Sequence, residues 1–76
     1  MRDETPYMVV LFRAVSHAMK AERVLKERGI PIKLIPVPKH ISSDCGVCIR
    51  FAPASRAEVE AALAGAVDVQ EIRSLK

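Results

Sequence analysis

Apolar residues recur along the first half of the chain in a pattern that predicts a strand, a helix and a second strand. Residues 7–12 form a continuous apolar run too short for a helix, which is typical of a strand buried on both faces. Ser16 can cap a helix that runs to Arg28 and stops at Gly29. The apolar residues at helical spacing within it are Ala18, Ala21, Val24 and Leu25. Residues 30–35 alternate as a strand does, and the two prolines that follow place this strand at a sheet edge.

The second half of the chain predicts a strand, a helix and a weak last strand. Residues 47–51 alternate between the two faces of a strand, with Cys48 and Arg50 on one face and apolar residues on the other. Ser55 begins a Ser-x-x-Glu capping box at the start of a helix. The predicted buried stripe of this helix consists of Val59, Ala62, Leu63 and Ala66. Residues 67–75 alternate less regularly, because a charged residue interrupts the apolar positions.

This order of elements, βαββαβ, predicts an α+β fold of the ferredoxin-like type. Its four strands would form one antiparallel sheet in the order 4-1-3-2, with both helices on one face. We expect the 76 residues to form a single domain, in which residues 1–6 are a loose N-terminal tail. The small core and the open face of the sheet predict a homodimer, because a second copy would shield apolar surface.

Composition and charge narrow the classes of partner. Half of the residues are apolar and 28% are charged, as in a folded globular domain. The net charge is +3, but lysine and arginine are spread along the chain, which does not indicate a nucleic-acid partner. No stretch approaches the roughly 18 apolar residues of a membrane span, and the N-terminus lacks the pattern of a signal peptide. We therefore expect a cytoplasmic protein without membrane or nucleic-acid partners.

The chemistry expected of this sequence lies in the loop before the third strand. Residues 38–48 contain both cysteines, Cys45 and Cys48, and one of the two histidines. In a reducing compartment, two cysteines at this spacing suggest redox, metal or sulfur chemistry more than a structural disulfide. Cys45 precedes the strand and is expected to be solvent-accessible, whereas Cys48 lies within the hydrogen-bonded ladder. Cys45 is therefore predicted to react faster.

Five further residues are candidates to support this thiol. Three are cations close in sequence that would favour the ionised thiol: Lys39, His40 and Arg50. Asp44 would oppose them. Gly46 leaves the approach of a sulfur donor free of a side chain. His17, at the start of the first helix, is a candidate proton donor. The first and third strands are neighbours in the predicted sheet, so the junction before this helix can lie near the loop that precedes the third strand.

Three chemistries compete for the cysteine pair. Redox exchange requires a turn at Gly46, because residues three apart on an extended chain are about 10 Å apart and a disulfide needs Cα atoms about 4.4–6.8 Å apart. Metal binding would use His40, Cys45 and Cys48, three donors where a structural zinc site needs four. Carriage of sulfur or selenium, as a persulfide or its selenium analogue, needs one accessible, partly ionised thiol and no cofactor.

Three stretches of the chain, 16–22, 29–38 and 41–51, carry a family resemblance, with the Ser-Ser-x-Cys-Gly segment at 42–46 the most distinctive. On these stretches the chain resembles the Se/S carrier protein-like family of small prokaryotic proteins, over nearly its whole length after Pro6. The resemblance implies a carrier more than an enzyme. Cys45 would take sulfur or selenium from a donor such as a cysteine desulfurase and pass it to an acceptor, with Cys48 as a resolving thiol. The alternative is a non-catalytic interaction domain with a metal-binding or redox cysteine pair.

Overall fold

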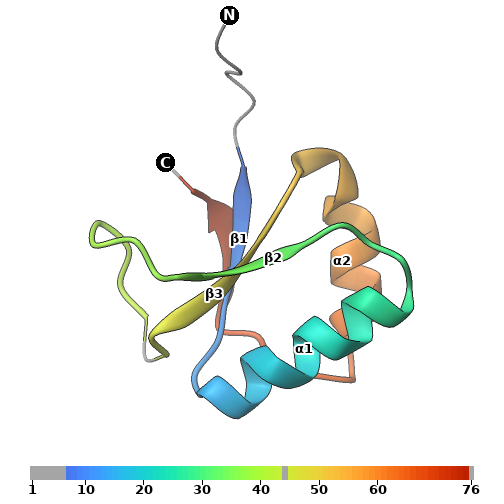
Figure 1. The fold of residues 1–76 in the computed structure, drawn as a ribbon, viewed down its shortest axis with the longest axis horizontal. Coiled ribbons are helices and arrows are strands. Elements are labelled where there is room, and N and C mark those ends of the chain that lie inside the picture. Colours follow the sequence, from blue (N-terminus) through green and yellow to red (C-terminus); the bar gives the residue numbers. More distant parts are fainter. Residues whose placement is uncertain (1–6, 44, 76) are drawn as a thin grey trace, which may run out of the picture.

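The computed structural model describes residues 7–43 and 45–75, and these form an α+β fold with four strands and two helices (Figure 1). Along the chain the elements are β1 (Met8–Leu11), α1 (Val15–Glu27), β2 (Lys33–Pro36), β3 (Val47–Phe51), a 3-10 turn (Pro53–Ser55), α2 (Arg56–Leu63) and β4 (Glu71–Ser74). The strands form one antiparallel sheet in the order β2-β3-β1-β4. This is the predicted order 4-1-3-2 read from the other edge, so the predicted topology is confirmed. The ferredoxin-like type remains an interpretation, and the predicted tail at 1–6 lies outside the described residues.

Both helices cover one face of the sheet, as Figure 1 shows for α1 and α2. Four residues in or next to the strands project into this helix-side core: Val10 in β1, Phe12 just after β1, and Ile49 and Phe51 in β3. The helix residues packed against them are Ala18, Ala21, Leu25, Val59, Ala62 and Leu63, which confirms most of the predicted helical stripes. Strand alternation explains which strand residues face the helices, because every second residue of β1 and β3 points to the same side.

The opposite face of the sheet is not open along its whole length. Val9, Leu11 and Cys48 form a smaller core there, and Ile41 from the β2–β3 loop closes over it with 5% of its surface exposed. Residues 9–12 are therefore fully buried. Residues 9–11 belong to β1 and lie between the two cores, as their unbroken apolar run predicts. The β2–β3 loop thus covers part of the sheet face that a second copy of the chain is predicted to cover.

Helix ends differ from the sequence predictions at both N-termini. The residue that precedes α1 is Ala14, in an extended conformation and without a side-chain cap, so the prediction of a Ser16 cap is wrong. Ser55 does precede α2, but its side chain makes no capping hydrogen bond. The 3-10 turn before α2 explains this, because Ser55 has φ −92° and ψ 2° instead of the extended backbone that a capping side chain needs.

The C-terminus of α1 follows the prediction closely. Gly29 has a φ of +73°, and its N–H bonds to the carbonyl of Lys26 at 3.0 Å. The N–H of Ile30 bonds to the carbonyl of Leu25 at 3.1 Å, which completes a Schellman motif. Glycine is favoured at this left-handed position because it has no Cβ to clash. Within the described part of the chain, no helix is long and apolar enough to cross a membrane.

Candidate functional site

The β2–β3 loop carries the predicted thiol and is tied to the end of β1. The hydroxyl of Ser43 lies 3.2 Å from the carbonyl oxygen of Phe12 and 3.4 Å from Oε1 of Gln70, and it can donate to either. The same hydroxyl accepts a hydrogen bond of 3.2 Å from the backbone N–H of Cys45. Figure 1 shows the end of this loop beside the turn that leads from β1 into α1. Ser43 therefore fixes the backbone of Cys45 at the β1–α1 junction.

Cys45 is buried, with 3% of its surface exposed, so the expected solvent accessibility of this thiol is wrong in this conformation. Its side chain belongs to the helix-side core, with Phe12 and Ala18 among the members of that cluster. The reason is the register of β3. Position 45 continues the row of Val47, Ile49 and Phe51, all of which face the helices.

Cys48 is also buried, with no exposed surface, but on the other face of the sheet. It sits in the central strand β3, opposite Leu11 of β1 and Ile35 of β2. Burial raises the pKa of the Cys48 thiol from its ordinary value of 9.0 to about 11, and the nearby Cys45 adds to this increase. Cys48 is therefore a neutral thiol at physiological pH.

The two thiols thus point into different cores, and both are free. A disulfide between them would require rearrangement of the start of β3, since bridged residues must direct their Cβ atoms toward each other. This arrangement weakens the redox alternative.

The metal-ligand set considered from the sequence is not assembled. His40 is exposed and its Nε2 lies 2.6 Å from the carbonyl oxygen of Leu75, near the C-terminus. Among residues 7–43 and 45–75, no three histidine, cysteine or acidic side chains are grouped so that they could hold a metal ion. The triad of His40, Cys45 and Cys48 therefore has no support from the geometry.

The predicted supporting cations lie in different places. Lys39 is exposed in the β2–β3 loop, and the guanidinium of Arg50 stacks over the ring of Tyr7, 4.2 Å from its centroid, near the far end of β3. His17 is half-buried on the first turn of α1, and its Nδ1 is buried without a hydrogen-bond partner. Asp44, expected to oppose ionisation of the thiol, lies outside the described residues.

Gly46 leaves the surface next to Cys45 open. It is exposed, and a Cβ built on it would meet no heavy atom within 4 Å. Its φ lies outside the left-handed region, so the backbone itself does not require glycine here.

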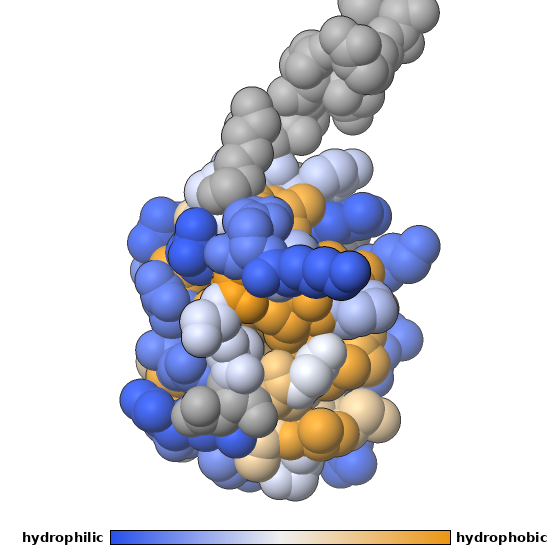
Figure 2. Space-filling view, turned by 90° about the vertical axis from the view of Figure 1, so that its left-hand side faces the viewer, coloured by the Kyte–Doolittle hydropathy of each residue, from blue (hydrophilic) through white to orange (hydrophobic). Residues whose placement is uncertain are grey.

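The outer surface at this end of the molecule combines apolar and hydrophilic areas. Figure 2 looks onto the side that carries the β2–β3 loop and shows apolar surface framed by hydrophilic side chains. Among the described residues, the large hydrophobic side chains that are exposed are Val15, at 54%, and Met19, at 49%. Both belong to the first half of α1 and are one helical turn apart.

Sequence reasoning missed the part played by Ser43. The Ser-Ser-x-Cys-Gly segment is distinctive in the sequence, which by itself predicts a role for the cysteine and for neither serine. A Ser-x-Cys spacing is itself the available signal, because a serine hydroxyl commonly accepts from the backbone N–H two residues later.

A comparison with models of protein families found a match. The model described as "Putative Se/S carrier protein-like" matches residues 7–72, which include β1 to the start of β4 and the whole β2–β3 loop. The chain belongs to this family. Comparisons of this Se/S carrier family member with curated proteins and with solved structures gave no match.

Proposed function

We propose that the protein carries sulfur or selenium on Cys45, as a persulfide or its selenium analogue, between a donor enzyme and an acceptor. Membership of the Se/S carrier family is the observation that carries the proposal. The assignment to Cys45 draws on the contrast with Cys48, which is enclosed in the central strand with a pKa of about 11. Only a thiolate attacks sulfur efficiently, so a thiol held neutral in a ladder is a poor acceptor.

The loading step is an exchange without net oxidation. The Cys45 thiolate attacks the outer sulfur of a persulfide on the donor enzyme, for example a cysteine desulfurase. A sulfur–sulfur bond forms at Cys45 Sγ, and the bond to the donor's cysteine breaks, which releases that cysteine as a thiolate. Delivery repeats the exchange in the other direction, onto a nucleophilic acceptor. No cofactor is consumed in either step.

Loading requires the loop to open, because Cys45 is 3% exposed. Among the described residues, the contacts that hold Cys45 closed include the bonds of the Ser43 hydroxyl and the packing of one small side chain. Opening at Cys48 would instead disturb pairing with both β1 and β2. Local opening of loops needs much less free energy than opening of central strands, which favours Cys45 as the exchanging thiol.

The end of α1 nearest this loop suits a negatively charged sulfur. Ser43 ties the loop to Phe12, three residues before α1 begins at Val15, and the first turn of α1 has no acidic residue and no side-chain cap. The positive end of the helix dipole would therefore stabilise a persulfide anion carried at this junction. Val15 and Met19 offer apolar contact area for the donor or acceptor beside it.

The test is intact-mass spectrometry after incubation with a cysteine desulfurase and cysteine. Wild type and Cys48→Ala are expected to gain the mass of one sulfur atom, about 32 Da, and Cys45→Ala to gain none. Circular dichroism of each variant controls for loss of fold. If folded Cys45→Ala still loads while Cys48→Ala does not, the assignment to Cys45 is wrong. If neither wild type nor variants load from sulfur or selenium donors, the carrier function itself is wrong.

The predicted homodimer remains a prediction. The homodimer is predicted from an open apolar face of the sheet, and the β2–β3 loop covers part of that face. The exposed large hydrophobic residues in the described part of the chain lie on α1 instead. The interaction-domain alternative predicts stable binding to a partner without sulfur loading, which the same mass measurement distinguishes.

A further inference from the structure

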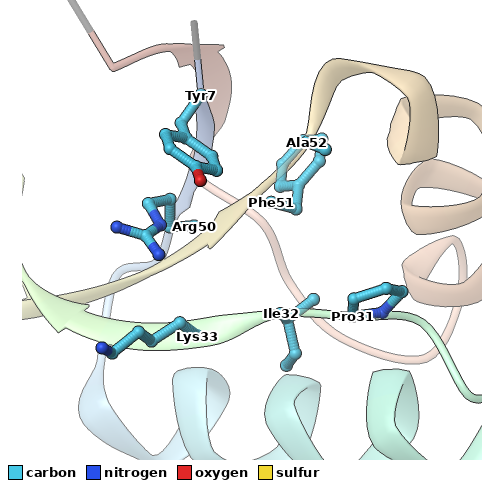
Figure 3. A pocket seen from close by; sticks show the side chains of 7 residues that line it. All are labelled: Tyr7, Pro31, Ile32, Lys33, Arg50, Phe51 and Ala52. Carbon is cyan, nitrogen blue, oxygen red and sulfur yellow. The ribbon is translucent and has the colours of Figure 1, made fainter. Parts of the chain in front are cut away.

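A cavity lies at the far end of β3 from Cys45, where β2 and β3 separate (Figure 3). Lys33 and Arg50 form the first pair of the β2–β3 ladder. This cavity of about 320 Å³ is bordered by the residues next to this pair: Pro31 and Ile32 before Lys33, and Phe51 and Ala52 after Arg50. Figure 3 shows this fork with Tyr7 above Arg50. The volume lies within the range of small-ligand sites.

The polar groups of this cavity are two cations and a phenol. Lys33 and Arg50 are directly opposite each other, and side chains in such a pair project from the same face with Cβ atoms about 5 Å apart. Figure 3 shows both basic side chains extending to the same side. Like charges at opposed positions destabilise a sheet. An anion between them would remove this repulsion.

No carboxylate of the described residues forms an ion pair with Lys33 or Arg50. The ion pairs formed among those residues lie elsewhere: Arg13 with Asp68, Lys26 with Glu22, and Arg56 with Glu60. The Arg50 guanidinium is instead fixed by the Tyr7 ring, 4.2 Å from its centroid. Stacking occupies one face of the guanidinium and leaves its edge, which carries the N–H donors, for an in-plane ligand.

We propose that this fork binds an oxyanion, a phosphate or carboxylate group of a small molecule, between Lys33 and Arg50. The guanidinium of Arg50 supplies two parallel N–H donors to the oxyanion, and Lys33 supplies a mobile point charge. Pro31 and Ile32, which line the same cavity, offer apolar contact to a hydrocarbon part of the same ligand. The site is independent of Cys45, which lies before the opposite end of β3.

Tyrosine fluorescence gives a direct test, because Tyr7 is the single tyrosine and the chain has no tryptophan. Wild type is titrated with sodium phosphate and, separately, sodium acetate, each against sodium chloride at the same ionic strength. A saturable change with phosphate, acetate or both is expected, and the stronger response identifies the preferred group. Arg50→Gln and Lys33→Gln should each weaken the affinity by about tenfold, the effect of one charge-assisted hydrogen bond. Lys26→Gln, which removes a cation from α1, should bind as wild type does.

The proposal is overturned if wild type gives no saturable change beyond the chloride control, or if Arg50→Gln binds as tightly as wild type. Equal losses in all three variants would show general attraction to a basic protein and would also overturn it. Lys33→Glu adds an independent check, because the new carboxylate takes the place of the anion beside Arg50. It should abolish the phosphate response and raise Tm; a lower Tm would mean that the two side chains do not meet, and the proposal would fail.

Discussion

Cys45 and Cys48 are three residues apart and almost equally buried, yet they occupy different environments. Cys45 lies under the end of a loop, on the helix side of the sheet, and its backbone is held by the hydroxyl of Ser43. Cys48 lies in the central strand, on the other side, between paired residues of two strands and beneath Ile41. Static exposure, 3% against 0%, therefore does not distinguish the two thiols.

The difference lies in what must move before each thiol can react. Exposing Cys45 requires a short loop segment to release side-chain hydrogen bonds, whereas exposing Cys48 requires the loop over it to move and a central strand to open. A single motif thus contains one thiol beneath the end of a loop and one within the central strand of the sheet. Strand alternation places them on opposite faces, and the start of β3 at Val47 places only one of them in the ladder.

The largest expected effect is the protection of Cys48. In Cys45→Ala, which retains Cys48 alone, alkylation by iodoacetamide at pH 8 should be at least about tenfold slower in the folded protein than in urea. The raised pKa of Cys48 comes mainly from burial, which remains in this variant although the smaller contribution of Cys45 is removed, and burial also slows access of the reagent. The rate against pH is measured by intact mass under both conditions.

Cys48→Ala, which retains Cys45 alone, is the matched control for this measurement. We expect a smaller difference between its folded and urea-denatured rates, because only the loop must open. A folded-state rate for Cys48 equal to or above that for Cys45 would contradict the comparison on which the carrier assignment depends.

The raised pKa of Cys48 also predicts how stability depends on pH. Between pH 9 and about 11 the unfolded thiol loses its proton while the folded thiol keeps it, so ionisation favours the unfolded state. The contribution of Cys48 to stability is therefore complete below pH 9 and is lost as the pH rises toward 11.

Urea denaturation of wild type and Cys48→Ala at pH 8, 9, 10 and 11 measures this effect. The other titrating groups are common to both proteins, so the difference between the two free energies of unfolding isolates Cys48. The stability advantage of wild type should shrink with rising pH. A difference that is constant from pH 8 to 11 would show that Cys48 ionises equally in both states.

Much of the fold could be predicted because its signals are local. The apolar run at 7–12, the glycine at 29 and the alternation at 47–51 each determine an element without reference to the rest of the chain. The capping predictions failed because they depend on backbone angles that tertiary packing sets. At Ser55, for example, a 3-10 turn replaces the extended residue that a capping box requires.

The site was less predictable, because burial in the β2–β3 loop depends on contacts distant in sequence. Nothing near Cys45 in the sequence indicates that Phe12 and Gln70 anchor the serine before it, 31 and 27 residues away. For the same reason Arg50, close to Cys45 in sequence, lies with Tyr7 at the other end of its strand. The pKa of Cys48 depends on distant contacts as well, because its burial comes from Val9, Leu11 and the loop residue Ile41 on its face of the sheet.

The smallest predicted effect tests whether Ser43 holds the loop closed. In a Cys48→Ala background, Ser43→Ala removes an acceptor for the N–H of Cys45 and a donor to Phe12 or Gln70. A net loss of about 1 kcal/mol would raise the population of the open loop, and so the alkylation rate of Cys45, by about fivefold. Ser42→Ala is the matched control, because Ser42 is exposed and one residue away. It should leave the rate unchanged. Equal rates in Ser43→Ala and Ser42→Ala would mean that loop opening does not limit access to Cys45, and that its difference from Cys48 has another origin.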